Sequence, residues 1–193
     1  KDCIALGVTS FDHADIYGSY TTEEEFGHVL KQNPSLRQQM QLITKCGIQM
    51  VSPNRSQHKI KSYDTSFKDI IESVETSLEN FSTDYIDCLL IHRPDQLFNA
   101  DEVAKAFTQQ GKVRHFGVSN FKRWQFDLLF SRFPVEVNQI ECSLLQLTPF
   151  VDGTLDQCQQ HHITPMAWSP LGGGNLFTDT DDEQNKRIIA VAN

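Results

Sequence analysis

The sequence predicts an α/β protein with the (β/α)8, or TIM, barrel fold, of which this chain holds an incomplete part. Short apolar runs alternate with amphipathic segments in roughly six units, which is typical of parallel strands joined by crossover helices. Polar side chains lie within or at the ends of these runs, and only a barrel brings all such ends around one mouth. An open dinucleotide-binding sheet usually has G-x-G-x-x-G after its first strand, and this sequence has none there.

The first elements are short. Residues 1–6 have the pattern of a helix end that Gly7 closes. Residues 8–12 alternate between apolar and polar positions and are expected to form the first strand. A helix is expected over 21–31, because threonines precede three glutamates that suit the positive end of a helix dipole.

The middle of the chain has the clearest patterns. A strand is expected at 41–46, and polar residues with helix breakers predict irregular structure over 51–64. Apolar residues spaced three and four apart predict a helix over 65–81. The nearly continuous apolar run 85–91 is typical of a strand that is buried on both faces.

The last part of the chain continues the same alternation. Glycine at position 111 marks the end of one helix, and a glycine-rich run follows the last strand. We expect helices at 101–110, 122–130, 153–161 and 181–192, and strands at 112–118, 135–142 and 164–168.

A complete barrel has eight strands and typically about 250 residues. This chain has 193 residues, which we interpret as a single barrel domain spanning 1–193. We therefore expect at least one strand before Lys1 and one after Asn193 to be missing from it.

The composition of the chain argues against several classes of binding partner and binding site. A net charge of −8 argues against a general nucleic-acid or anionic-membrane binder, because both partners would be repelled. Five cysteines without a C-x-x-C spacing indicate reduced, mostly buried thiols rather than a disulfide framework or a metal site. There is no apolar run long enough to span a bilayer, and we expect a cytoplasmic protein.

The densest group of reactive side chains lies at 11–18, Phe-Asp-His-Ala-Asp-Ile-Tyr-Gly, just after the first strand. A polar loop positioned by a strand is a common place for chemistry. The alternative is a helix N-cap, supplied by Asp12 or Asp15, followed by an ordinary loop tyrosine. This stretch alone does not separate the two interpretations.

A barrel mouth would bring Asp12 and Tyr17 close to Lys45 and His92. A free tyrosine has a pKa of about 10, and a neighbouring ammonium lowers the pKa by favouring the phenolate. A neutral histidine can donate a hydrogen bond to a carbonyl oxygen. These groups suit proton donation to a carbonyl oxygen while a hydride from a bound cofactor attacks the carbon.

Six motifs in register resemble the aldo-keto reductases, most closely a little-characterised bacterial branch. Residues 11–18 are similar to the family's F-D-T-A-x-x-Y-G signature, with His13 in place of threonine. The others are L-I-T-K at 42–45, L-I-H at 90–92, G-V-S-N-F at 117–121, V-N-Q-I-E at 137–141 and W-S-P-L-G at 168–172.

The resemblance implies an NADPH-dependent reductase of small aldehydes or ketones, with NADH as an alternative cofactor. It implies a catalytic tetrad in which Tyr17 is the general acid and base. The implied catalytic residues are Asp12, Tyr17, Lys45 and His92. The implied cofactor contacts are Ser119, Asn120 and Gln139 to the carboxamide, Trp168 stacked on the ring, and Ser169, Leu171, Gly172, Gly173 and Gly174 near the pyrophosphate.

Other features have simpler interpretations. Taken singly, a lysine is usually a surface charge, a histidine after a buried strand is usually structural, and a tryptophan on a strand is more often in the core. We assign mainly structural roles to His13, Asp15 and Arg93. Trp124 is expected in the core or at its rim. Residues 106–112 and 133–138 are shorter than the family's equivalents, so we expect residues to be missing there.

Two functions remain open at this stage. The first is carbonyl reduction, which the complete tetrad favours. The second is a regulatory barrel that keeps a cofactor but acts through a protein partner, as do the potassium-channel β-subunits that resemble this family.

Overall fold

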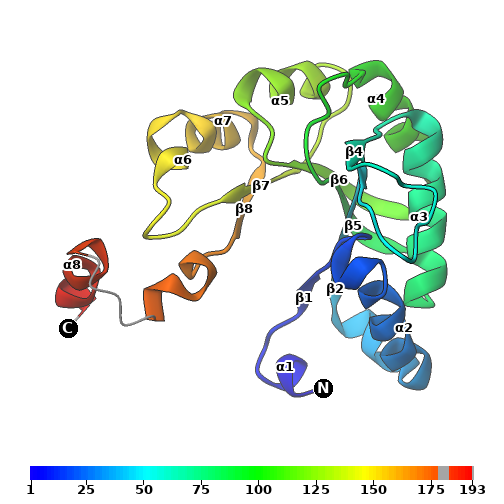
Figure 1. The fold of residues 1–193 in the computed structure, drawn as a ribbon, viewed down its shortest axis with the longest axis horizontal. Coiled ribbons are helices and arrows are strands. Elements are labelled where there is room, and N and C mark those ends of the chain that lie inside the picture. The colour runs from blue at the N-terminus through cyan, green and yellow to red at the C-terminus, as the bar shows by residue number, and fades with distance from the viewer. Residues whose placement is uncertain (178–182, 193) are drawn as a thin grey trace.

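Six parallel strands form one curled sheet, in the order β1-β2-β5-β6-β7-β8, in a computed structural model that describes residues 1–177 and 183–192. The sheet is an open half-barrel with the helices along its outer side (Figure 1), which confirms an incomplete (β/α)8 barrel. The strands are β1 (Ser10–Asp12), β2 (Gln41–Cys46), β5 (Ile86–Ile91), β6 (Val113–Ser119), β7 (Val137–Glu141) and β8 (Thr164–Trp168).

The expected helices are present with small differences at their ends. The α-helices are α1 (Asp2–Ala5), α2 (Thr22–Gln32), α3 (Phe67–Phe81), α4 (Ala100–Gln109), α5 (Arg123–Phe130), α6 (Thr148–Val151), α7 (Thr154–His161) and α8 (Glu183–Ala192). Three 3₁₀ turns are η1 (Tyr17–Ser19), η2 (Pro34–Gln39) and η3 (Gly172–Phe177). The first two residues of the helix expected at 181–192 lie outside the described residues.

Local hydrogen bonds explain where elements begin later than expected. Helix α3 begins at Phe67 rather than 65, because the Ser66 side chain accepts from the Asp69 amide and caps it. Strand β1 begins at Ser10 rather than 8, because the Val8 amide donates to Cys3 O (2.9 Å). Strand β7 begins at 137 rather than 135, because the Val135 amide donates within a turn.

The main core lies between the sheet and its outer helices. Every residue of β5 is buried, which confirms the predicted buried strand for 86–91, whereas Tyr85 lies before the strand and is half-buried. Phe107 of α4 stacks on Phe116 of β6 with ring centroids 4.3 Å apart. A smaller cluster of Ile43, Cys88 and Leu90 packs with Val137 and Met166 on the sheet. All five cysteines are free, and three are buried.

The connections expected to lack residues close without a break. Helix α4 ends at Gln109, β6 begins at Val113, and Val113 pairs in parallel with Ile86. Strands β6 and β7 are also paired in parallel, with Gly117 opposite Val137. The short connections at 106–112 and 133–138 still deliver each strand in register, and the absence of residues there relative to the family stays a prediction.

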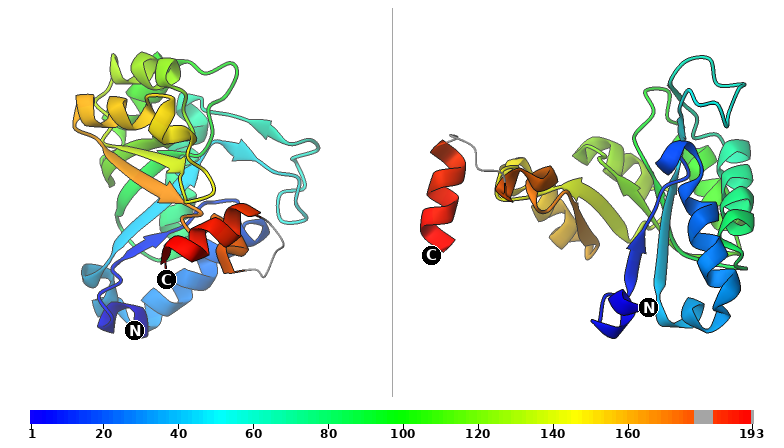
Figure 2. Two further views of the ribbon diagram at one scale, coloured as in Figure 1. Left: turned by 90° about the vertical axis from the view of Figure 1, so that its left-hand side faces the viewer. Right: turned by 60° about the horizontal axis from the view of Figure 1, so that its bottom comes forward.

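A two-stranded hairpin was not expected. Strands β3 (Ile48–Gln49) and β4 (Ser62–Tyr63) pair antiparallel, so the prediction of irregular structure over 51–64 is wrong at its end. The segment between them projects clear of the sheet (Figure 2). No helix in the described ranges has the length and hydropathy needed to cross a bilayer.

Candidate active site

The carboxyl ends of the strands gather around one pocket of about 320 Å³. Parallel strands in a barrel present these ends on one side, and enzymes of this fold place their sites there. The described residues that line it are Ile16, Tyr17, Ile48, Lys61, His92, Arg93, Ser119, Asn120, Gln139 and Trp168. The pocket thus brings together six of the residues that the sequence predicts for the site.

Lys45 is the buried centre of the polar group, with only 1% of its surface exposed. Its ammonium Nζ donates to Asp12 Oδ1 at 2.8 Å, to the His13 carbonyl at 2.7 Å and to Tyr17 Oη at 3.5 Å. A buried ammonium is costly unless it is paired and hydrogen-bonded, and these contacts use its donors. Lys45 therefore contacts both Asp12 and Tyr17.

Tyr17 begins the η1 turn that follows β1. Its ring lies edge-on to the His92 ring, with centroids 5.9 Å apart and planes at 79°. The residue is 38% exposed, so a ligand in the pocket can reach it. The four residues of the predicted tetrad thus come from three different strand ends and meet at one place.

His92 follows β5 and is buried. Burial lowers the pKa of its imidazole to about 3, and the positive charges of Lys45, Arg93 and Lys61 add to this effect. The ring is therefore neutral at pH 7. Its Nδ1 atom is buried and has no hydrogen-bond partner among the described residues, which leaves Nε2 as the nitrogen available to a ligand.

Hydrogen bonds tie the remaining pocket residues to one another. Trp168 Nε1 donates to Asn120 Oδ1 at 2.9 Å, and Asn120 Nδ2 donates to Ser119 Oγ at 2.6 Å. Gln139 Nε2 donates to Asp12 Oδ2 at 3.0 Å. The sequence did not predict this last contact, which fixes one end of the Gln139 amide inside the site.

The glycine-rich loop lies after β8, outside the lining of this pocket. Ser169, Leu171, Gly172 and Gly173 belong to it, and they do not join the tetrad. Gly172, Gly173 and Gly174 have φ values of 60°, 64° and 93°, the left-handed region that favours glycine. A Cβ atom at Gly173 or Gly174 would meet nothing within 4 Å, so the backbone there is open to a ligand.

Several pocket residues were not predicted. Ile48 and Lys61 arrive on the β3–β4 hairpin, which the sequence did not indicate. Arg93, assigned a mainly structural role, lines the pocket, and its guanidinium carbon lies 5.5 Å from the Trp168 ring centroid. Its position directly after His92 was the available signal.

The neighbours of the tetrad occupy supporting positions. His13 is buried and packs edge-on against Phe26 and Phe81, which confirms a structural role. Burial raises the pKa of Asp15 well above its usual value, and the nearby Glu23 charge adds to this rise. Trp124 is 67% exposed, so it lies at the surface and not in the core.

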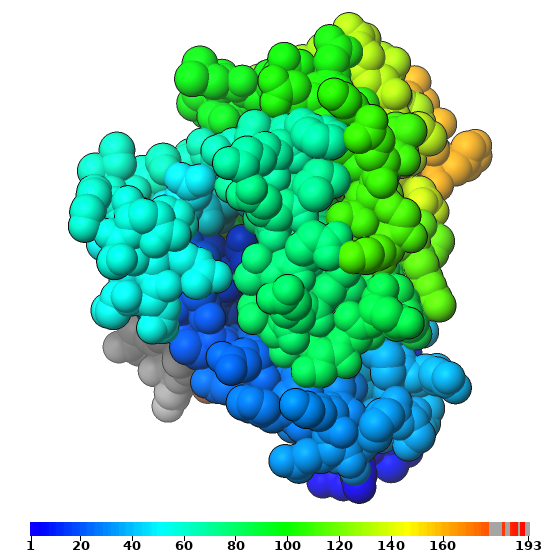
Figure 3. Space-filling view, turned by 90° about the vertical axis from the view of Figure 1, so that its right-hand side faces the viewer, coloured from blue at the N-terminus to red at the C-terminus, as the bar shows by residue number. Residues whose placement is uncertain are grey.

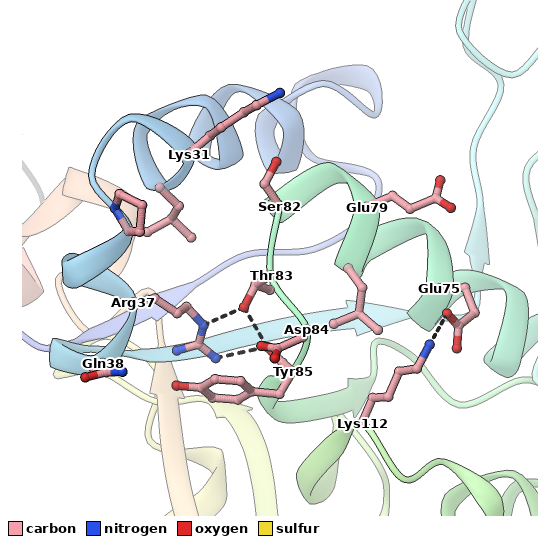
Figure 4. Close-up of a pocket in the computed structure, with 13 residues that line it drawn as sticks. Lys31, Arg37, Gln38, Glu75, Glu79, Ser82, Thr83, Asp84, Tyr85 and Lys112 are labelled. Atoms are coloured by element: carbon pink, nitrogen blue, oxygen red, sulfur yellow. Dashed lines mark hydrogen bonds and ion pairs between the residues drawn. The ribbon is translucent and has the colours of Figure 1, made fainter.

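Two other cavities are lined by none of the four tetrad residues. One is the hollow between residues 51–61 and α3 (Figure 3), which Asp15, Arg55 and Asp69 help to line. A larger cavity of about 870 Å³ lies between α2, η2 and α3, near the amino-terminal end of β5 (Figure 4). Arg37 in this cavity already forms an ion pair with Asp87 at 2.6 Å. The amino-terminal face of a barrel usually contributes to stability, whereas active sites lie at the carboxyl-terminal face.

The model of the Aldo/keto reductase family matches residues 1–188. The chain belongs to this family. It is 52% identical to an uncharacterized oxidoreductase, YcsN, of Bacillus subtilis, over 98% of this chain and 65% of that protein. It is 54% identical to the oxidoreductase YdhF of Escherichia coli, over 99% of this chain and 65% of YdhF. The chain therefore spans about 65% of the length of these relatives.

Solved structures of the family have the same arrangement. The thermostable aldo-keto reductase Tm1743, solved with the inhibitor epalrestat, matches with a TM-score of 0.78 and 29% identity over 96% of this chain and 62% of that one. An aldo/keto reductase from Klebsiella pneumoniae in complex with NADP and acetate matches with a TM-score of 0.73 and 26% identity, over 91% and 58% of the two chains. The half-barrel thus corresponds to part of the family's barrel.

Proposed function

We propose that this chain carries the reaction centre of an oxidoreductase that reduces an aldehyde or ketone with NADPH, with Tyr17 as the proton donor. The observation that supports it best is the contact of the buried Lys45 ammonium with both Asp12 and Tyr17. An ammonium at this distance favours the phenolate that remains after Tyr17 gives up its proton. Asp12 holds the ammonium beside that hydroxyl.

His92 orients the substrate in this proposal. Its neutral imidazole can donate a hydrogen bond to the carbonyl oxygen through Nε2 and so places that oxygen near Tyr17. The proton then moves from Tyr17 Oη to the oxygen as negative charge develops there. Because His92 stays neutral at pH 7, it does not compete with Tyr17 as the acid.

The pocket fits a nicotinamide cofactor. Ser119, Asn120 and Gln139 offer hydroxyl and amide groups for a carboxamide, and the Trp168 ring is available for stacking. Gly173 offers open backbone to a pyrophosphate, whereas the amides of Gly172 and Gly174 already donate within their own turn. When bound, the nicotinamide would supply the hydride that attacks the carbonyl carbon.

The relatives support the choice of reaction. A 6-dehydroglucose reductase of Agrobacterium fabrum is 48% identical over 91% of this chain and 61% of that protein. The NADP in the Klebsiella structure supports NADPH as the cofactor. The proposal includes a single barrel domain, a small-molecule substrate and a cytoplasmic location, with no role for nucleic acid or membrane.

Substitution of Tyr17 by phenylalanine tests the proposal in the complete protein. Removal of a general acid should lower kcat by about 10²–10⁴-fold. Quenching of protein fluorescence by NADPH should be retained, because the proposed cofactor contacts are intact. Tyr85→Phe is the matched control, since Tyr85 lies between Arg37 and Arg114, away from the pocket.

Unchanged reduction rates in the Tyr17→Phe protein would reject the proposal. Retained cofactor binding with no turnover of any carbonyl by the wild-type protein would instead favour the regulatory barrel.

A further inference from the structure

Two cationic side chains line the pocket without an acidic partner. Arg93 and Lys61 both border it, and neither forms an ion pair with a carboxylate within residues 1–177 and 183–192. The chain as a whole carries a net charge of −8, with 25 acidic residues against 17 basic ones. The positive charge of the exposed Lys61 and the half-buried Arg93 is therefore not neutralised by a carboxylate of the described residues.

The position of Arg93 is set by its neighbours in the chain. It follows His92 at the end of β5 and precedes Pro94, whose ring restricts the backbone of Arg93 to extended conformations. The nearest carboxylate along the chain, Asp95, accepts a hydrogen bond from the Leu97 amide at 3.0 Å. The guanidinium lies instead near the face of Trp168, 5.5 Å from its ring centroid.

Lys61 reaches the pocket from a different element. It precedes β4 in the hairpin, and its ammonium lies 6.0 Å from the Tyr63 ring centroid. Ile48 of β3 lines the pocket beside it and adds apolar surface. The two cations therefore reach the same pocket from different elements, Arg93 from a strand end and Lys61 from the hairpin.

Both charges act on the same space as the tetrad. After burial, the positive charges of Lys45, Arg93 and Lys61 each lower the pKa of His92. The carboxylate of Asp12 neutralises the charge of Lys45, but no carboxylate among the described residues forms an ion pair with Arg93 or Lys61. A negative group on a ligand would remove this excess of positive charge.

We propose that the substrate is a small aldehyde or ketone that carries an anionic group, a carboxylate, sulfonate or phosphate, which binds to Arg93 and Lys61. This inference rests on the proposed function and specifies its substrate. The guanidinium fork suits such oxyanions, and the ammonium adds a point charge. With the anion there, the carbonyl lies toward Tyr17 and His92, which line the same pocket.

Matched aldehydes test this specificity in the complete protein. The anionic probes are 4-formylbenzoate, 4-formylbenzenesulfonate and 4-formylphenyl phosphate, and the neutral probe is 4-formylbenzamide. At least one anion should have a kcat/KM ten or more times that of the amide, mainly through a lower KM. The preference should fall with added salt, and the three anions identify the preferred group.

Two substitutions assign the preference to the residues. Arg93→Gln and Lys61→Met should each lower the ratio of anion to amide kcat/KM, by about tenfold and about threefold. Comparing the ratio cancels the different intrinsic reactivity of the aldehydes. Lys59→Met is the matched control, because Lys59 is an exposed lysine of the same segment that does not line the pocket.

Three results would overturn the inference. The first is equal kcat/KM for anions and amide in the wild type, and the second is a preference that survives in the double variant. The third is a loss of NADPH affinity in Arg93→Gln that matches the loss of anion preference, since the cation would then serve the cofactor. If no aldehyde is reduced, the proposed function fails, and calorimetric binding of 4-(hydroxymethyl)benzoate against its amide still decides the anion site.

Discussion

Gln139 Nε2 lies 3.0 Å from Asp12 Oδ2, a hydrogen bond between residues 127 positions apart in the chain. The other oxygen, Asp12 Oδ1, accepts from Lys45 at 2.8 Å. One carboxylate therefore joins three strands, β1, β2 and β7, at the mouth of the half-barrel. Asp12 stabilises the site as well as contributing to its chemistry.

Replacement of Asp12 by asparagine should destabilise the fold and lower activity together. The substitution keeps the shape but leaves the buried Lys45 ammonium without its negative partner. Because Asp12 is partly exposed, we expect a loss of about 1–3 kcal/mol in the free energy of unfolding, below that of a fully buried pair. Urea unfolding measures it. Asp84→Asn, at an exposed aspartate, is the control, and an equal change in both variants would contradict the prediction.

Glu23 is a buried carboxylate that stabilises this region, with 2% of its surface exposed. It accepts from Thr44 Oγ1 at 2.6 Å, Ser77 Oγ at 2.9 Å and Asn80 Nδ2 at 3.1 Å, so it joins α2 to β2 and α3. We expect Glu23→Ala to cost about 2–4 kcal/mol, because it leaves the buried hydroxyls of Thr44 and Ser77 and the partly buried Asn80 amide unpaired. Urea unfolding of Glu24→Gln, an exposed neighbour, should show a change of no more than about 0.5 kcal/mol.

The sequence predicted most of the fold because strand alternation, glycines and caps are local. It also predicted the gathering of Asp12, Tyr17, Lys45 and His92, since strand order in a barrel decides which ends meet. The contact from Gln139 to Asp12 was not predictable, because it depends on the curvature of the sheet. The chemical roles of the four tetrad residues stay predictions.

The β3–β4 hairpin was missed for a different reason. A short loop of glycine or asparagine marks many hairpins, but here Ile48 pairs with Tyr63 across a long polar segment that contains Pro53. Without that pairing, Lys61 has no predictable position. Surface lysines are common, so its place beside the tetrad required the structure.

Asp69 should make stability depend on pH in the acidic range. Burial raises the pKa of its carboxyl to about 6, and the Asp64 charge adds to the rise. The unfolded carboxyl ionises near pH 4, so stability is lost as the pH rises from about 4 through 6. The Asp69→Asn variant should therefore be more stable than the wild type over that pH range and equally stable below it.

The expected gain in the free energy of unfolding of Asp69→Asn is small, because Asp69 is partly exposed. It also lies in the first turn of α3, where a negative charge is favourable. We expect less than about 1 kcal/mol at pH 7 after allowance for screening. Thermal unfolding at pH 4 and pH 7 measures the difference between the two proteins. A variant less stable than the wild type at pH 7 would show that the helix dipole outweighs burial.

His92 should produce the opposite dependence. The pKa of its imidazole is about 3 when folded, mainly because of burial, and near 6.5 when unfolded. Between these values only the unfolded chain takes up the proton, so stability is complete above pH 6.5 and is lost as the pH falls toward 3. The loss from this residue should approach about 1.4 kcal/mol per pH unit between pH 5.5 and 4.

His92→Gln should remove this slope, whereas His28→Gln, at an exposed histidine of α2, should retain it. Urea unfolding at half-unit steps from pH 4 to 7 gives the slope for each protein. Because His92 stays neutral, its titration should produce no step in kcat/KM of the wild type near pH 6.5. An equal slope in the wild type and His92→Gln would mean that the pKa of the ring is not lowered in the folded protein, so that the ring would take up a proton below about pH 6.5.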